Sequence, residues 1–146
     1  MMSTNMMTTK RTYSELITIP SFLDRYLYLK LGGVIGEETF GYERQLNQTL
    51  YRSGEWRRFR RDVIIRDKGC DLAHYDYEIC DKILVHHIDP ITPKDVLSRD
   101  PKIFDLENVV CVSLNTHNAI HYGDESLLLL DPIIRVPNDT CPWKRN

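Results

Sequence analysis

Two segments decide the fold: KILVHHIDP at residues 82–90 and ENVVCVSLNTHNAIHYG at residues 107–123. The apolar run 82–85 and the β-branched run 108–113 each predict a short strand. Thr116 is a suitable N-cap for a helix over residues 117–122, and Gly123 suits the end of that helix. The pattern therefore predicts two strands followed by a short helix, within an α+β fold.

Four of the five histidines lie in these two segments. His86 and His87 follow the first predicted strand, and His117 and His121 are four residues apart on the predicted helix. Side chains at that spacing share one helical face, so both imidazoles can reach the same ion. Because three imidazoles leave positions open for water and substrate, the sequence predicts a catalytic metal site.

The order of these residues resembles the HNH motif of the His-Me finger (ββα-metal) nucleases. In that motif a histidine pair ends the first strand, an asparagine opens the second, and an H-x3-H pair lies on the helix. Asn108 precedes His117 by nine residues, a spacing similar to that of many HNH nucleases. The resemblance covers about residues 66–123 and implies a ββα-metal core. Residues 39–67 more loosely resemble the lead-in of HNH proteins from phages and prophages.

The resemblance also implies a role for each polar residue. His87 would be the general base, a task that suits a neutral imidazole. His86, His117 and His121 would hold one divalent ion (magnesium, manganese, zinc or nickel). Asn108 would complete the catalytic set by bracing the loop and orienting the ring of the base. Because neighbouring strand residues point to opposite faces, the histidine pair is expected at the end of its strand.

A basic helix is predicted immediately before the motif, over residues 55–67. Trp56, Phe59, Val63 and Ile64 recur on one face, which predicts that this face is buried. Residues 52–68 hold seven cations against three acids, although the whole chain has a net charge of −2. A phosphate-binding face would therefore be confined to this helix, and a solvated surface helix is the alternative. The arginines expected to contact DNA are Arg57, Arg58, Arg60, Arg61 and Arg66.

The cysteines do not form the two CxxC pairs that hold a structural zinc in many HNH proteins. Cys70 matches the first position, but Ala73, Ser113 and Thr116 stand at the others, so a structural zinc is not expected. An irregular site made of Cys70, His74, Cys80 and Cys111 is the alternative to small buried thiols. Without zinc, His74 would be structural or exposed. The stabilising core would be Trp56, Phe59, Ile64, Leu84 and Val110.

The rest of the chain is expected to support this motif. We predict a disordered start (1–12), a helical region with the basic helix (13–65), the nuclease core (66–123) and a C-terminal extension (124–146). Further expected helices are one capped by Ser21 and ended by Gly32 and Gly33, one near 42–51, and a turn at 94–98. No leader pattern and no apolar run of about 18 residues are seen, so no membrane partner and a cytoplasmic location are expected.

The expected function is metal-dependent hydrolysis of phosphodiester bonds in double-stranded DNA. A phage-encoded protein would act in the host cytoplasm, and a link to DNA packaging beside a terminase follows from the resemblance alone. Two alternatives remain open: a non-catalytic DNA-binding or packaging accessory that keeps the HNH scaffold, and a structural zinc module. The oligomeric state, the DNA sequence recognised and the choice between nicking and double-strand cleavage stay undetermined.

Overall fold

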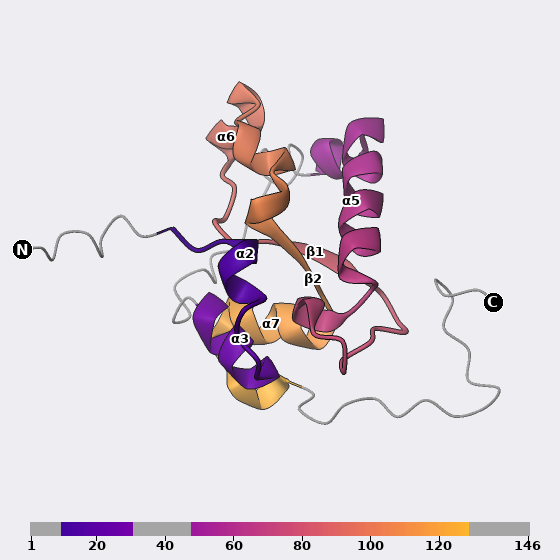
Figure 1. The fold of residues 1–146 in the computed structure, drawn as a ribbon. Coiled ribbons are helices and arrows are strands. Elements are labelled where there is room, and N and C mark those ends of the chain that lie inside the picture. The colour runs from indigo at the N-terminus through magenta and orange to yellow at the C-terminus, as the bar shows by residue number, and fades with distance from the viewer. Residues whose placement is uncertain (1–9, 31–47, 129–146) are drawn as a thin grey trace, which may run out of the picture.

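The computed structural model describes residues 10–30 and 48–128. Its described part has an α+β fold, in which a two-stranded antiparallel sheet lies between helices (Figure 1). The elements are α2 (Tyr13–Leu16), α3 (Phe22–Leu29), α5 (Gly54–Asp67), η1 (Asp71–Ala73), β1 (Leu84–His87), α6 (Pro93–Ser98), η2 (Pro101–Phe104), η3 (Leu106–Asn108), β2 (Val109–Val112), α7 (Leu114–Tyr122) and η4 (Glu125–Leu127).

The two faces of the sheet carry two separate hydrophobic clusters. Strand residues alternate between faces, and the register pairs His86 with Val110 and His87 with Val109. One face packs against α3 and α7 through a cluster that includes Val110, Val112 and Ile120. The other face packs against α5 through a cluster that includes Trp56, Phe59, Val63, Val109 and Cys111. The two histidines at the end of β1 therefore belong to opposite sides of the sheet.

Local sequence signals explain most of the helices. The Ser21 side chain accepts a hydrogen bond from the Asp24 amide and begins α3, as predicted. Ser53 does the same for the Trp56 amide at the start of α5, where Trp56, Phe59 and Val63 are buried. Ile64 is only half-buried, because it lies at the margin of the buried stripe. The predicted basic helix is thus confirmed, with one core residue placed differently.

Several predicted boundaries are wrong, including that of the second strand, which spans Val109–Val112 and not 108–113. The motif helix α7 begins at Leu114 with Ser113 as its N-cap, because the Ser113 hydroxyl accepts from the Thr116 amide at 3.1 Å. Thr116, the predicted cap, lies inside the helix. Strand β1 runs from Leu84 to His87, two residues later than predicted, since its pairing with β2 continues as far as Val109. His86 and His87 are therefore the last two residues of the strand.

The long connection between the strands contains more structure than the single turn that was predicted. A capping box between Thr92 and Asp95 begins α6, and the 3-10 helices η2 and η3 follow it. Helix α3 ends at Leu29 with Lys30 extended, so the predicted end at Gly32 and Gly33 is wrong. The predicted disordered start is also wrong for residues 10–12, since Thr12 caps α2. The expectations for residues 1–9, 42–47 and the tail from 129 lie outside the described residues. Residues 48–52, which belong to the helix predicted near 42–51, are helical.

Side chains of α5 cover the outer edge of β2. Arg66 donates from Nη2 to the Val109 carbonyl at 2.7 Å, and Asp67 accepts from the Cys111 amide at 2.9 Å. Arg66 and Asp67 also pair with each other, at 2.7 Å between Nε and Oδ1. These contacts satisfy backbone groups that an unpaired strand edge would leave exposed. They also turn the Arg66 side chain toward the interior.

Replacement of Asp67 by alanine is expected to destabilise the fold by about 3 kcal/mol, because it leaves the Cys111 amide and the Arg66 guanidinium without their buried partner. The free energy of unfolding in urea measures this loss. Asp62→Ala is the matched control, since Asp62 is exposed on the same helix. Equal stability of the two variants would remove the edge-covering role from Asp67.

Candidate metal centre

The three predicted metal ligands, His86, His117 and His121, lie near one another on the face of the sheet that is covered by α7. The His86 ring lies 6.4 Å from the His117 ring, measured between centroids, and the two planes are nearly perpendicular. The His121 ring is parallel to the His117 ring, with centroids 6.1 Å apart, and the two residues share one face of α7, as their spacing predicts. One strand residue and two helix residues therefore present their imidazoles in a row.

The distances between the ring centroids in this row are larger than those in a closed coordination site. Two imidazoles bound to one zinc ion at its usual nitrogen distances have centroids roughly 5 Å apart. In the described part of the chain, no group of three or more His, Cys, Asp or Glu side chains is close enough to hold an ion. The centroids of neighbouring rings would have to move about 1 Å closer together for the three histidines to share an ion at those distances.

Two ring nitrogens in this row have the character expected of ligands. His86 Nε2 and His117 Nδ1 are buried, and neither has a hydrogen-bond partner within the described residues. A buried polar nitrogen without a partner is costly, so each would gain from a bound ion. Burial lowers the pKa of His86 to about 3, with smaller contributions from His117, His87 and Arg11. The neutral form of imidazole, which metals bind, is therefore the stable form.

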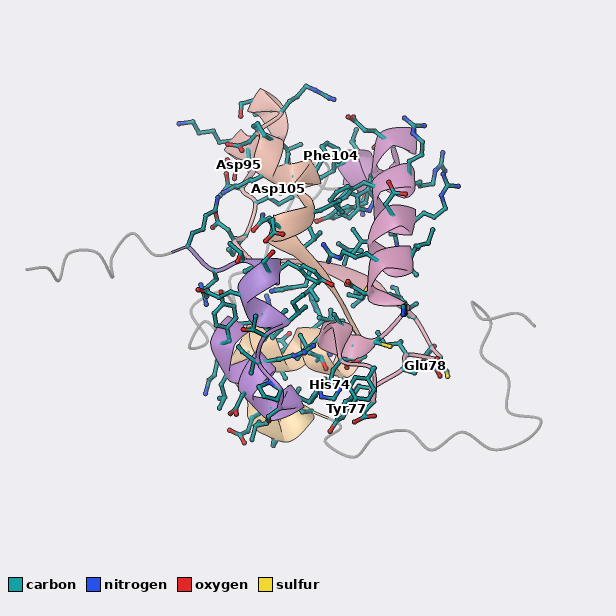
Figure 2. All side chains as sticks on the ribbon, in the orientation of Figure 1. His74, Tyr77, Glu78, Asp95, Phe104 and Asp105 are labelled. Carbon is teal, nitrogen blue, oxygen red and sulfur yellow. The ribbon has the colours of Figure 1, made fainter. Side chains whose placement is uncertain are left out.

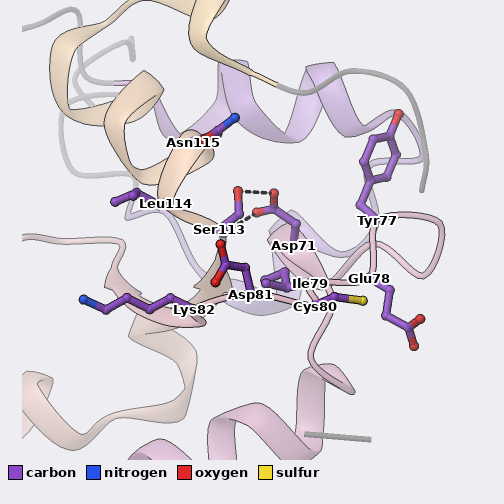
Figure 3. A pocket seen from close by; sticks show the side chains of 10 residues that line it. All are labelled: Asp71, Tyr77, Glu78, Ile79, Cys80, Asp81, Lys82, Ser113, Leu114 and Asn115. Atoms are coloured by element: carbon purple, nitrogen blue, oxygen red, sulfur yellow. Dashed lines mark hydrogen bonds between the residues drawn. The ribbon is translucent and has the colours of Figure 1, made fainter. Parts of the chain in front are cut away.

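A buried carboxylate fixes the start of the helix that carries His117 and His121. Asp71 accepts from the Ser113 hydroxyl at 2.8 Å and from the Thr116 hydroxyl at 2.7 Å, and Figure 3 shows its contact with Ser113. Asp71 also accepts from the Ser113 amide at 3.1 Å. Burial raises the pKa of Asp71, while the hydrogen bonds from Thr116 and Ser113 lower it. This network orients α7 relative to the sheet.

His87, the predicted general base, faces the side of the sheet covered by α5. Its Nε2 lies 3.0 Å from the Ile103 carbonyl oxygen, and its ring packs against the Trp56 ring with centroids 5.5 Å apart. A carbonyl can only accept, so the neutral ring carries its proton on Nε2 and leaves Nδ1 basic. Burial lowers the pKa of His87, and the Ile103 contact partly opposes this. His87 is therefore separate from the row of ligands.

Asn108 braces the loop that holds the ring of His87. Its Oδ1 accepts from the Asp89 amide at 2.8 Å, and its Nδ2 donates to the Asp89 and Lys102 carbonyls at 3.2 and 3.1 Å. Lys102 directly precedes Ile103, whose carbonyl contacts His87. Asn108 is almost fully buried. These contacts join Asn108 to the loop segments on both sides of the connection between the strands.

The five arginines that were predicted to contact DNA differ in exposure and fall into three groups. Arg57, Arg58 and Arg61 are exposed on α5. Arg60 is half-buried and donates from Nη2 to the Ile83 carbonyl at 2.7 Å. Arg66 is directed inward, where its guanidinium also lies 3.4 Å from the centre of the Tyr13 ring. Arg66 therefore stabilises the fold, and only the other four remain available to phosphate.

The cysteines and His74 do not form the alternative zinc site within the described residues. Cys70 and Cys111 are buried, and the Cys70 thiol donates to the Lys68 carbonyl at 3.6 Å. His74 lies beside Tyr77 (Figure 2), with Nε2 at 2.9 Å from the Pro20 carbonyl and Nδ1 accepting from the Asp76 amide. Both of its nitrogens are engaged and the residue is buried, so of the two expected environments, structural or exposed, His74 has the structural one. Cys141 lies outside the described residues.

Sequence reasoning missed the residues that hold His87. Trp56 was predicted only as a core residue, and Ile103 was not singled out. The contact from Ile103 is made by its backbone carbonyl, so the side chain gives no signal. The position of a carbonyl 16 residues away from His87 depends on the path of the whole connecting loop.

In comparisons with known proteins, no family model, no curated protein and no solved structure matches this chain. Among the described residues no helix has both the length and the apolar character needed to cross a bilayer.

Proposed function

We propose that this chain is a metal-dependent DNA endonuclease of the HNH type with a ββα-metal core. The observation that carries the proposal is the row of His86, His117 and His121, in which two neighbouring imidazoles have buried nitrogens that find no hydrogen-bond partner among the described residues. The separately held His87 and the bracing contacts of Asn108 support it, since they supply a base outside the ligand row.

The proposed chemistry divides the histidines into two groups. His86, His117 and His121 would hold one divalent ion, which supplies charge stabilisation to a phosphodiester and to its leaving 3′ oxygen. His87 would accept a proton from the attacking water at Nδ1, while its Nε2 stays on the Ile103 carbonyl. Asn108 is a positioning residue, because it fixes the loop that carries this carbonyl. Double-stranded DNA is the proposed substrate.

The looser similarity to phage proteins extends the proposal to its setting. A phage-encoded nuclease would act in the host cytoplasm, and packaging of DNA beside a terminase is one process that uses such an activity. The alternative function is a non-catalytic DNA-binding or packaging accessory. One observation favours that alternative: in the described residues the histidine rings do not form a closed metal-binding group.

A plasmid-nicking assay separates the two functions. The proposed nuclease converts supercoiled plasmid to the relaxed form with magnesium, manganese, zinc or nickel, and a chelator stops the reaction. His74→Gln is the matched control, because it removes the one histidine outside the motif. DNA binding without cleavage under every metal condition would favour the accessory protein, and cleavage that survives the chelator would refute a metal-dependent site.

The exposed arginines of α5 give a prediction about salt. If Arg57, Arg58 and Arg61 each contact a phosphate, their joint replacement by alanine should reduce the slope of log affinity against log salt by up to about 3, since each contact contributes about 0.9. Fluorescence anisotropy on a DNA duplex at several salt concentrations measures this slope. Lys94→Ala, an exposed cation on α6, should leave it unchanged. A slope that is the same in the triple variant would remove α5 from the DNA surface.

A further inference from the structure

A cleft of about 460 Å³ lies at the outer edge of β1. Among the described residues β1 pairs only with β2, so its other edge is open to this cleft. Tyr51, Trp56 and Arg60 line it on the side of α5, and Leu114, His117 and Asn118 line it on the side of α7. Its volume falls within the range of about 300–1,000 Å³ that is usual for sites of small ligands.

The cleft borders one group of histidines directly and the other through Trp56. His117, a proposed metal ligand, is part of its lining. Trp56, also in the lining, packs against the ring of His87, the proposed base. A molecule in the cleft would therefore lie next to the metal row on one side and next to the support of the base on the other.

The lining has the chemistry that binds a nucleotide. Tyr51 lines the cleft, is 42% exposed and packs against the buried Trp56 with ring centroids 5.0 Å apart. Lys82 and Arg60 provide two cations in the same lining. Exposed aromatic rings that stack with bases, together with cations that follow the phosphates, are the features by which proteins bind single-stranded nucleic acid.

We infer that this cleft binds one unpaired nucleotide of the DNA substrate, with its base on Tyr51 and its phosphate near Lys82 and Arg60. This inference rests on the proposed nuclease function and names the form of DNA that the nuclease would prefer. A base inside a duplex is stacked on both faces and cannot reach Tyr51. DNA with a single-stranded segment beside the cleavage site should therefore bind more tightly than a blunt duplex. An extended peptide paired with β1 would have no use for the two cations.

Binding by the full chain tests the inference with three labelled oligonucleotides: a blunt duplex, the same duplex with a single-stranded overhang, and a single strand. Tyr51→Ala should weaken binding of the overhang and the single strand by about 5- to 100-fold, the range expected for loss of one stacked base. Binding of the blunt duplex should stay unchanged. Tyr51→Phe keeps the aromatic ring and should restore the affinity, and Lys82→Ala should make binding of the overhang less sensitive to salt.

Tyr75→Ala is the matched control, since Tyr75 is the more exposed tyrosine, at 83%, and lies outside the cleft. The inference is overturned if Tyr51→Ala weakens all three DNAs equally or none of them, or if a peptide competes for the cleft and the single strand does not. Because binding is measured without cleavage, the two proposals fail separately. A Tyr51-dependent preference in a protein that cleaves no DNA would support the cleft and reject the nuclease.

Discussion

Replacement of His87 by alanine is expected to lower metal-dependent cleavage of plasmid DNA by about 100- to 10,000-fold, the contribution usual for a general base. Metal affinity should stay unchanged, because His87 lies on the α5 side of the sheet and the ligand row lies on the α7 side. Rates of nicking at saturating metal, together with a metal titration of the same sample, measure both quantities.

The control for this variant is His74→Gln, which should cleave at the rate of the unmodified protein. Undiminished cleavage by His87→Ala would exclude His87 as the base. Loss of metal binding together with cleavage would assign His87 to the metal site, and the separation of the two histidine groups would then be wrong.

Replacement of His117 by alanine should have the largest effect on metal binding, with a loss of affinity of at least about 100-fold, the upper end of what changes outside the ligand set cost. His117 is central in the row, because its ring lies next to both other rings. Isothermal titration calorimetry with zinc or nickel measures the affinity. His86→Ala and His121→Ala should each show a loss of the same kind.

Metal binding should also stabilise the folded protein, since it gives partners to His86 Nε2 and His117 Nδ1. At a free metal concentration 100 times the dissociation constant, the gain in the free energy of unfolding should be about 2.7 kcal/mol. Thermal unfolding with and without metal detects it. Equal stabilisation of the unmodified protein and His117→Ala would place the ion elsewhere.

The sequence predicts those parts of the fold that depend on local signals. Ser21 begins a helix and Gly123 ends one with a φ of 66°, because a hydroxyl at an N-cap and a glycine at a left-handed position act over a few residues. The i, i+4 spacing of His117 and His121 likewise predicts that they share one face of α7. The predicted cap of that helix, Thr116, is wrong by three residues, because the Thr116 amide donates to the hydroxyl of Ser113.

The features that the sequence could not predict depend on distant contacts. Arg66 and Arg61 are both arginines of α5. Only the Arg66 side chain points inward, because the Val109 carbonyl and Asp67 lie beside it. The ring of His87 is held by a carbonyl whose position follows from α6, η2 and Asn108. Helical or strand periodicity cannot encode these contacts, since Arg66 and Val109 are 43 residues apart and His87 and Ile103 are 16 apart.

X-ray absorption spectroscopy of the zinc-loaded protein tests most directly whether His86, His117 and His121 share one ion. The account predicts three imidazole nitrogens at about 2.0–2.1 Å from zinc, and two in His117→Ala. Fewer than three imidazoles in the unmodified protein, or sulfur in the coordination sphere, would contradict it.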